Sequence, residues 1–532
     1  MNGAKPIRNP TTGMPDFPRL VERGARYIDK TALLYRLAAE EEETQFFLSR
    51  PRRFGKSLML STLKAMFECR RELFKGLAID SLPWEWDRPY PVLHFDMTQL
   101  SPSEGIDAMK RTLRLLVDER RKAFGLPPAP GDLPGFAFSE LLQDVAASSP
   151  TGQVVVLIDE YDAPVAGVLD RPDELREVRW FLHDFYQRLK NNAGVIRFLM
   201  MTGVTKLAKL SVFSGLNHLV DLSMSADYAT LLGYTPEELD GPLRENVEAF
   251  GEARGEDFAA AKAELLSWYD GYRFSPESGA KVCNPVSFGR ALATGRLVNY
   301  WESTGTSSII LDRIKAAGEM PADLNGLAVT RTQLDVCDVE TMPLPALLYQ
   351  GGYLTIKDVV GEDMLVLGMP NNEVSDSLAK GYVAKLLGDG MADWNDRLLD
   401  ARLAIRAGGV GPMVRKNLRA AFAAVPHEWK VESEKEAKRY FLLFLKLLGA
   451  DISGERQCAR GRADAILEDK TGVYVFEFKY GKTAREAVEQ ARAKDYAGPW
   501  LDGARPVFLV GVNYDPAARG IDDPVVEPAQ VR

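Results

Sequence analysis

Three adjacent residues, Gly55-Lys56-Ser57, carry the chemical groups that a phosphate-binding loop uses. They follow the apolar run 46–48 and a basic turn, and they precede a segment whose apolar residues recur at helical spacing. Backbone N–H groups at a helix N-terminus bind anions, and the helix dipole favours negative charge there. We therefore expect Lys56 to reach the β- and γ-phosphates of a nucleotide and the Ser57 hydroxyl to bind Mg²⁺. Gly-Lys-Ser alone is a weak signal, and Arg50 stands where the usual pattern has its first glycine.

A second set of polar residues follows about a hundred positions later. The continuous apolar run 154–158 predicts a strand buried on both faces of a parallel sheet, and it ends in Asp159 and Glu160. Ligands bind at the carboxyl ends of strands in open α/β sheets. Asp159 is therefore expected to hold Mg²⁺, and Glu160 to orient and deprotonate an attacking water. The alternative is a strand with a polar turn, but two motifs in the right order favour a nucleotide site.

The elements that position these residues alternate between strand and helix over the first 225 residues. The patterns predict strands at 44–49, 92–97, 154–159 and 196–202, and helices at 56–69, 103–124, 136–147 and 173–192. This alternation predicts an α/β fold with a parallel sheet covered on both faces. Thr202 ends the fourth strand, where it either senses a γ-phosphate or belongs to a turn.

Two basic side chains in the turn, Arg52 and Arg53, have two open roles. With Arg50 in place of a glycine, the backbone cradles phosphate less well, so these arginines are expected to hold phosphate. The other interpretation is a contact with a neighbouring subunit, which would require a homo-oligomer.

The last hundred residues hold a second constellation. The segment 473–480 predicts a strand whose period of two puts Glu477 and Lys479 on one face. Asp464 lies on the preceding predicted strand, and a hairpin would bring it beside Glu477. Two carboxylates can share a divalent cation while a neighbouring lysine activates or positions water. A surface Glu–Lys pair of little energetic value is the alternative. The following helix, with Gln490 and Lys494 on one face, strengthens the site interpretation.

A further acid precedes these strands. Apolar residues at helical spacing predict a helix over 434–448, and stepping back from Ala437 puts Glu434 on its buried face. Glu434 is therefore a candidate third acid of the C-terminal site. A carboxylate stabilised by the helix dipole is the competing interpretation.

Composition indicates a large globular chain. Its 532 residues are too many for one core and predict two to four domains, and the net charge of −9 argues against a surface coated with nucleic-acid-binding charge. No apolar run approaches the roughly 18–20 residues needed to span a bilayer, and the first residues have no apolar h-region. The four cysteines are isolated. We therefore expect a cytoplasmic protein with reduced thiols and no membrane partner.

The chain resembles prokaryotic AAA-ATPase-like proteins that carry a C-terminal PD-(D/E)xK nuclease-superfamily domain. The resemblance covers nearly the whole chain, and its loop motif already lacks the first glycine. The segments that carry it are 27–31, 50–57, 157–164, 213–217, 268–272, 284–285, 300–301, 461–464 and 477–479. One departure is Lys438-Arg439-Tyr440, where the family often has a helix start richer in tyrosine and histidine.

The resemblance implies an AAA-like P-loop domain at 1–225, a mainly helical middle region at 226–405 and an α/β restriction-endonuclease-like domain at 425–532. It implies ATP and Mg²⁺ at Lys56, Ser57, Asp159 and Glu160. It also implies a phosphodiesterase at Asp464, Glu477 and Lys479 that uses Mg²⁺ or Mn²⁺, with DNA as the partner.

Two classes of function stay open. In the first, the protein is an ATP-dependent nuclease; in the second, it is a nucleotide-switch regulator whose nuclease-like domain binds nucleic acid or a partner without cutting. Paired acids favour the first, because a binding module does not need them. Charge favours neither, since nine Lys and Arg residues balance nine Asp and Glu residues over 451–495.

Overall fold

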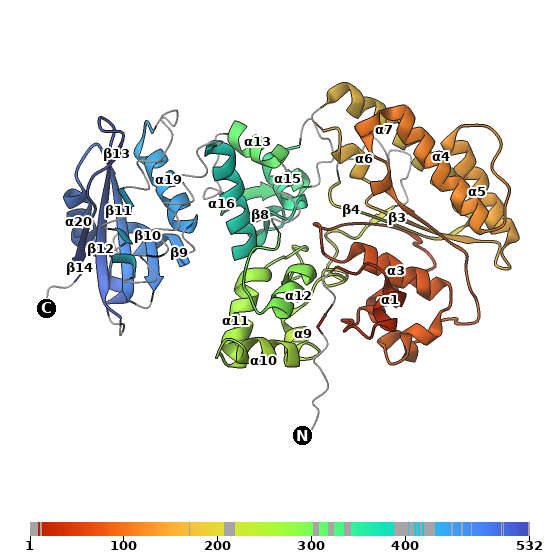
Figure 1. Cartoon of the computed structure of the whole chain (residues 1–532), viewed down its shortest axis with the longest axis horizontal. Helices are drawn as coiled ribbons and strands as arrows, with labels where there is room; N and C mark the ends of the chain where they lie inside the picture. The colour runs from red at the N-terminus through yellow and green to blue at the C-terminus, as the bar shows by residue number, and fades with distance from the viewer. Residues whose placement is uncertain are drawn as a thin grey trace, which may run out of the picture. The chain divides into compact units, whose positions relative to one another are not determined.

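The computed structural model divides into two compact units, Met1–Thr304 with Leu324–Val374, and Gly305–Asp323 with Ser375–Arg532 (Figure 1). Segment 213–217, which contributes to the resemblance, lies outside the residues that the structure describes. The described residues are 9–10, 13–169, 171–206, 219–301, 308–317, 324–334, 342–387, 403, 409–411, 413–414, 418–419, 431–447, 451–458, 461–469, 471–501, 503 and 505–529.

A five-stranded parallel sheet forms the centre of the first unit. Its strands are β1 (Gln45–Ser49), β2 (Val92–Asp96), β3 (Val154–Asp159), β4 (Ile196–Gly203) and β5 (Val220–Asp221). Their spatial order is β2-β3-β4-β1-β5, so β4 lies between the strand before the phosphate loop and the strand that ends in Asp159. Every residue of β1 and β3 is buried. The predicted α/β fold and its four strands are confirmed; β5 was not predicted.

Helices cover this sheet on both faces, as Figure 1 shows, with α1 and α3 on one side and α4, α5 and α7 on the other. Their apolar stripes account for this: Leu113 and Val117 of α4, for example, are buried, while charged residues occupy the solvent side. The four helices predicted between the strands are confirmed to within a few residues at each end. The bounds are α1 (Phe17–Glu22), α2 (Thr31–Ala38), α3 (Lys56–Phe67), α4 (Ile106–Ala123), α5 (Pro134–Ser148), α6 (Ala163–Ala166) and α7 (Pro172–Asn191).

The middle of the chain is helical, as predicted, and also contains a small antiparallel sheet that was not predicted. The sheet has the order β6-β8-β7, formed by β6 (Leu327–Thr330), β7 (Thr355–Val360) and β8 (Met364–Gly368). The aromatic segment 268–272 is packed in this region, because Tyr269 and Tyr272 are buried. The helices are α9 (Pro236–Asp240), α10 (Arg244–Glu252), α11 (Phe258–Tyr269), α12 (Pro285–Thr294), α13 (Ser308–Ala316), α14 (Arg331–Leu334), α15 (Leu344–Gln350) and α16 (Asn372–Leu387).

The second unit contains a mixed sheet in the order β13-β12-β11-β10-β9, with β14 also paired to β12. Helix α20 packs on β11 and β12, and α19 packs on β9 and β11, so the two helices lie on opposite sides of the sheet in Figure 1. The predicted C-terminal α/β domain is confirmed. Its elements are α19 (Glu434–Leu447), β9 (Asp451–Cys458), β10 (Gly461–Asp469), β11 (Gly472–Tyr480), α20 (Ala484–Ala493), β12 (Val507–Asp515), β13 (Gly520–Ile521) and β14 (Val525–Pro528).

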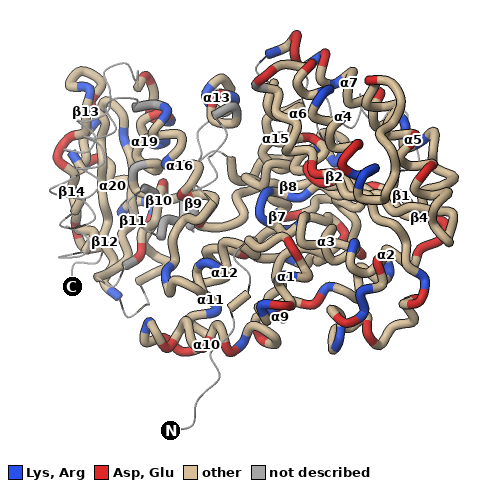
Figure 2. The backbone as a smooth tube through the Cα atoms, turned by 45° about the vertical axis from the view of Figure 1, so that its right-hand side comes forward, with Lys and Arg blue, Asp and Glu red and all other residues tan. Residues whose placement is uncertain are grey.

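Charges of both signs are interspersed along the outer helices, as Figure 2 shows for α4, α7 and α10. Among the described residues, no helix combines the length and the apolar character needed to cross a membrane.

Candidate functional site

The turn between β1 and α3 has the backbone of an anion-binding loop. Gly55 is the N-cap of α3 with φ of +95°, a conformation that glycine adopts without strain. Arg53 also has a positive φ, of +68°, so the chain turns sharply before the helix. The first N–H groups of any α-helix lack an intrahelical partner and can bind a ligand. Here the helix N-terminus borders a cavity that Gly55, Lys56 and Ser57 help to line.

Lys56 lies at the first position of α3 and is only 3% exposed. Its ammonium donates to the carbonyl oxygens of Arg50 at 3.0 Å and Pro51 at 3.3 Å, and lies 3.1 Å from Oε1 of Glu160. Burial raises the pKa of Glu160, and the charge of Lys56 opposes that shift. The two predicted motifs therefore meet in an ion pair between the buried Lys56 and the partly exposed Glu160.

Asp159 is held by the end of the neighbouring strand. Its Oδ1 accepts hydrogen bonds from the Thr202 hydroxyl at 2.6 Å and from the backbone N–H of Glu160 at 3.0 Å. Glu160 itself has φ of +48°, which turns its side chain away from the course of β3. Thr202 lies inside β4 and is fully buried, so it is not part of a turn. Its contact is with Asp159, and its role as a γ-phosphate sensor stays a prediction.

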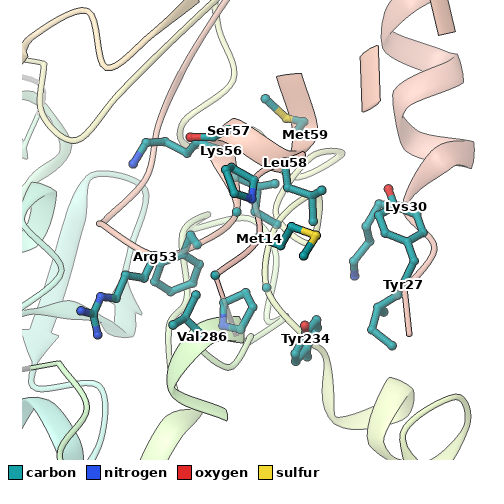
Figure 3. A pocket seen from close by; sticks show the side chains of 18 of the residues that line it. Met14, Tyr27, Lys30, Arg53, Lys56, Ser57, Leu58, Met59, Tyr234 and Val286 are labelled. Carbon is teal, nitrogen blue, oxygen red and sulfur yellow. The ribbon is translucent and has the colours of Figure 1, made fainter. Parts of the chain in front are cut away.

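The cavity has a volume of about 380 Å³ and combines a polar end with an apolar wall. Figure 3 shows Arg53, Lys56 and Ser57 on one side, Leu58, Met14 and Val286 in the middle, and Tyr27 and Lys30 on the other side. This division suits a ligand with a charged phosphate end and an apolar, planar end. The residues that line the apolar part include Met14, Tyr27, Ile28, Leu34, Leu58, Met59, Leu232, Tyr234, Pro285 and Val286.

This apolar wall was not predicted from the sequence, because it comes from several segments far apart in the chain. Two of them, 27–31 and 284–285, carry the family resemblance, which was the available signal. Asn284 links wall and loop: its side chain caps α12 by accepting from Val286 and Ser287, and its amide donates to the carbonyl of Arg52.

Arg50 takes a structural role at the position of the missing glycine. Its side chain is 1% exposed and donates to the carbonyl oxygens of Ser49 at 2.9 Å and Ser223 at 2.7 Å. The guanidinium carbon lies 4.0 Å from the centre of the Phe274 ring. Burial lowers the pKa of Arg50 to about 10, which still leaves the group charged at neutral pH. This arginine therefore ties the start of the loop to the residues that follow β5.

The two turn arginines differ in their surroundings. Arg52 is exposed, whereas Arg53 borders the cavity and donates to the carbonyl of Tyr300 at 2.6 Å. The backbone N–H groups of Tyr300 and Trp301 donate to Oε1 of Glu373 at 2.8 and 3.0 Å. Glu373 is fully buried, and burial raises its pKa to about 7. Both predicted roles of the two arginines stay predictions.

The C-terminal acids meet on adjacent antiparallel strands. Ala465 of β10 pairs with Phe476 of β11, so continuing the register by one residue brings Asp464 opposite Glu477. Asp464 Oδ2 accepts from the backbone N–H of Phe478 at 2.8 Å, and its Oδ1 lies 2.7 Å from the ammonium of Lys438. The hairpin predicted from the sequence therefore forms and brings the two carboxylates together.

Glu477 is 3% exposed and its two oxygens differ. Oε1 accepts from the ammonium of Lys479 at 2.9 Å and from the amide of Gln490 on α20. Oε2 is buried without a hydrogen-bond partner among the described residues. Burial, followed by the adjacent charge of Asp464, raises the pKa of Glu477 to about 7, although the neighbouring Lys479 opposes the shift.

These groups fit a divalent cation. Two adjoining carboxylates offer the hard oxygen ligands that Mg²⁺ and Mn²⁺ accept, and the unpartnered Oε2 of Glu477 is a ligand atom in need of a partner. Among the residues that the structure describes, no three His, Cys, Asp or Glu side chains cluster as metal ligands. Asp464 and Glu477 would therefore hold the ion together with other oxygen ligands.

The prediction that Glu434 lies on the buried face of α19 is wrong, because Glu434 is exposed. The stripe is buried only from Ala437 onward, and the first turn faces solvent, where the dipole stabilises a carboxylate. Lys438, one turn later, contacts Asp464, and no role was predicted for it. Its only signal was its place in the segment that departs from the family pattern.

Comparison with known proteins agrees with this architecture. Residues 11–213 match the family model described as "Predicted AAA-ATPase", and residues 432–523 match the PD-(D/E)XK nuclease superfamily. A relative from Azotobacter chroococcum mcd 1, named "Uncharacterized protein in vnfD 5'region", is 32% identical over 513 residues. The match covers 94% of this chain and 95% of the relative.

Proposed function

Since this chain belongs to the family of AAA-ATPase-like proteins with a C-terminal PD-(D/E)XK nuclease-superfamily domain, we propose that it binds and hydrolyses ATP and cuts DNA in a metal-dependent reaction. The observation that carries the ATP part is the ion pair between the buried Lys56 and Glu160 at the polar end of a cavity with an apolar wall. The adjoining Asp464 and Glu477 carboxylates carry the nuclease part.

At the nucleotide site, each residue has a separate task. The N-terminus of α3 and the ammonium of Lys56 bind the phosphates, and the apolar wall accepts the base. Ser57 and Asp159 would hold Mg²⁺, which supplies charge neutralisation at the phosphates when it is bound. Phosphate competes with Glu160 for Lys56, so ATP binding frees the Glu160 carboxylate to orient a water and take its proton. Thr202 fixes the Asp159 carboxylate through its 2.6 Å hydrogen bond.

At the C-terminal centre, Asp464 and Glu477 would hold one divalent ion, which acts as a Lewis acid on a phosphodiester when it is bound. Lys479 and Gln490 fix Oε1 of Glu477, so Oε2 would be the oxygen available to a divalent ion. The ammonium of Lys479 lies in the same cluster and can position a water or stabilise charge on the phosphate.

A specific observation favours the second candidate function, a regulator that binds without cutting. The ammonium of Lys438 lies 2.7 Å from Oδ1 of Asp464, so one potential ligand oxygen already has a cationic partner. If this pair resists displacement, the domain would bind nucleic acid or a partner without a metal ion.

The two candidates are separated by incubating the purified full-length protein with supercoiled and single-stranded DNA. Each substrate is tested with and without ATP, and with Mg²⁺, Mn²⁺ or a chelator. We expect nicking or degradation that needs the metal ion and that Asp464→Asn abolishes. DNA binding without cleavage under every condition would favour the regulator. ATP hydrolysis is measured in parallel by phosphate release, and its absence in wild type would contradict the ATPase proposal.

A further inference from the structure

Asp464 has a donor on each of its two oxygens, and the two donors differ in mobility. The backbone N–H of Phe478 belongs to β11 and cannot leave without opening the sheet. The ammonium of Lys438 is carried by a flexible side chain on α19 and can leave. A cation that uses Oδ1 of Asp464 must therefore displace Lys438.

The second acid is arranged in the opposite way. Both donors to Glu477, Lys479 and Gln490, bind Oε1, and Oε2 has no partner among the described residues. Glu477 thus presents a ligand atom without a hydrogen-bond partner among the described residues, while Oδ1 of Asp464 is already bound to Lys438. Entry of the ion is controlled on the Asp464 side.

The formal charges point to the same control. Asp464, Glu477, Lys438 and Lys479 are two carboxylates and two ammonium groups, which cancel when all four are ionised. A divalent ion then gives the cluster an excess of two positive charges, which favours a polyanionic phosphodiester. Without the ammonium of Lys438, the same ion leaves an excess of only one.

We propose that Lys438 is a positioning residue of this centre, which competes with the divalent ion for Asp464 and, once displaced, adds positive charge for the nucleic-acid phosphate. The inference rests on the proposed metal-dependent function. Metal binding should then raise the affinity for DNA, and DNA binding the affinity for metal. The ion displaces the ammonium of Lys438 from Asp464, and the DNA phosphate pairs with that ammonium.

The test is calorimetric titration of the full-length protein with Mn²⁺, without nucleotide or DNA. The component of binding that Asp464→Asn removes belongs to this centre. Lys438→Met should bind Mn²⁺ about tenfold more tightly than wild type in that component, since the charge-assisted competitor for Asp464 is lost. Lys438→Arg should stay within about threefold of wild type. Lys435→Met on the exposed side of α19 is the matched control and should change nothing.

A second readout is the affinity for a short DNA duplex by fluorescence anisotropy, with Ca²⁺ or with a chelator. Wild type should gain affinity with Ca²⁺, and Lys438→Met should gain severalfold less. Equal Mn²⁺ affinity in wild type and Lys438→Met, with an intact Asp464-dependent component, would refute the role of Lys438. It would leave the proposed metal-dependent function standing. If no variant shows an Asp464-dependent component, the proposed metal-dependent function fails with it.

Discussion

The ammonium of Lys56 and the carboxylate of Glu160 lie 3.1 Å apart, although Lys56 begins α3 and Glu160 follows β3, more than a hundred positions later in the chain. Lys56 is nearly inaccessible to solvent, so the pair is screened little by water. A nucleotide phosphate must compete with Glu160 for this ammonium. The first two predictions follow from that competition.

Replacing Lys56 by alanine should weaken ATP binding at least about a hundredfold, because the change removes a buried charge-assisted contact to phosphate. Binding is measured by titration calorimetry, with the melting temperature as a check on folding. Lys64→Ala, in the last turn of the same helix, should bind ATP like wild type. Equal ATP affinity in Lys56→Ala and wild type would rule out the phosphate-loop interpretation.

Glu160→Gln should separate binding from turnover. The amide keeps the shape of the side chain but cannot take a proton from water, and it no longer competes as a charge for Lys56. We expect ATP affinity equal to or tighter than that of wild type, with hydrolysis slowed about a hundredfold or more. Single-turnover phosphate release measures the second effect. Hydrolysis at the wild-type rate would assign the base role to another residue.

The polar half of the nucleotide site was predictable because its residues lie in the segments that follow two short apolar strands, and parallel strands bring such ends to one edge of the sheet. The apolar wall was not predictable, since it forms only when segments near residues 27, 232 and 286 fold against the loop. The sheet β6-β8-β7 was missed for a similar reason. Its short strands depend on pairing with each other and carry little periodicity of their own.

The structure differs from the prediction at two further positions, and both differences depend on contacts between distant parts of the chain. In the sequence Arg50 only marks the absence of the usual glycine, because its partners Ser223 and Phe274 lie more than 170 residues away. On α19 the predicted stripe from Ala437 is correct, but periodicity could not show where burial begins. Glu434 therefore looked buried, and the contact between Lys438 and Asp464 depends on pairing of strands that follow the helix.

Restoring the usual glycine with Arg50→Gly should destabilise the protein by about 2–4 kcal/mol. The carbonyls of Ser49 and Ser223 would lose their hydrogen-bond donor. Removal of the side chain would also leave a cavity beside the Phe274 ring. Urea unfolding measures the change. Arg52→Gly, at the exposed neighbouring position, should cost about 1 kcal/mol or less. A higher free energy of unfolding in Arg50→Gly than in wild type would show that the buried guanidinium destabilises the folded state.

Asp464→Asn should abolish metal-dependent DNA cleavage and leave ATP affinity unchanged, because Asp464 and the nucleotide-site residues belong to different compact units. The asparagine can still accept from Phe478 but offers no charge to a cation. Asp523→Asn removes a surface carboxylate from the same unit and should keep full activity. Cleavage that survives in Asp464→Asn would mean that another site cuts the DNA.

Glu373→Gln tests the buried carboxyl group that supports Arg53 through Tyr300. Its pKa in the folded protein is about 7, above the ordinary value of 4.5, so the folded state binds the extra proton between these pH values. Wild-type stability should therefore fall as pH rises from about 4.5 to 7, by an amount of the order of 3 kcal/mol from this group. Glutamine resembles the protonated acid, and its carbonyl can still accept from Tyr300 and Trp301.

The expected result is near-equal stability of wild type and Glu373→Gln at about pH 4, and a more stable variant at pH 8. Urea unfolding at several pH values measures the difference, which should stop growing above about pH 7.5. Glu362→Gln, at an exposed turn, should keep the wild-type pH profile. ATP affinity in Glu373→Gln should stay within about twofold of wild type, because the amide preserves the support of the Arg53 contact. A stability difference that does not vary with pH would mean that Glu373 is ionised in the folded protein throughout this range.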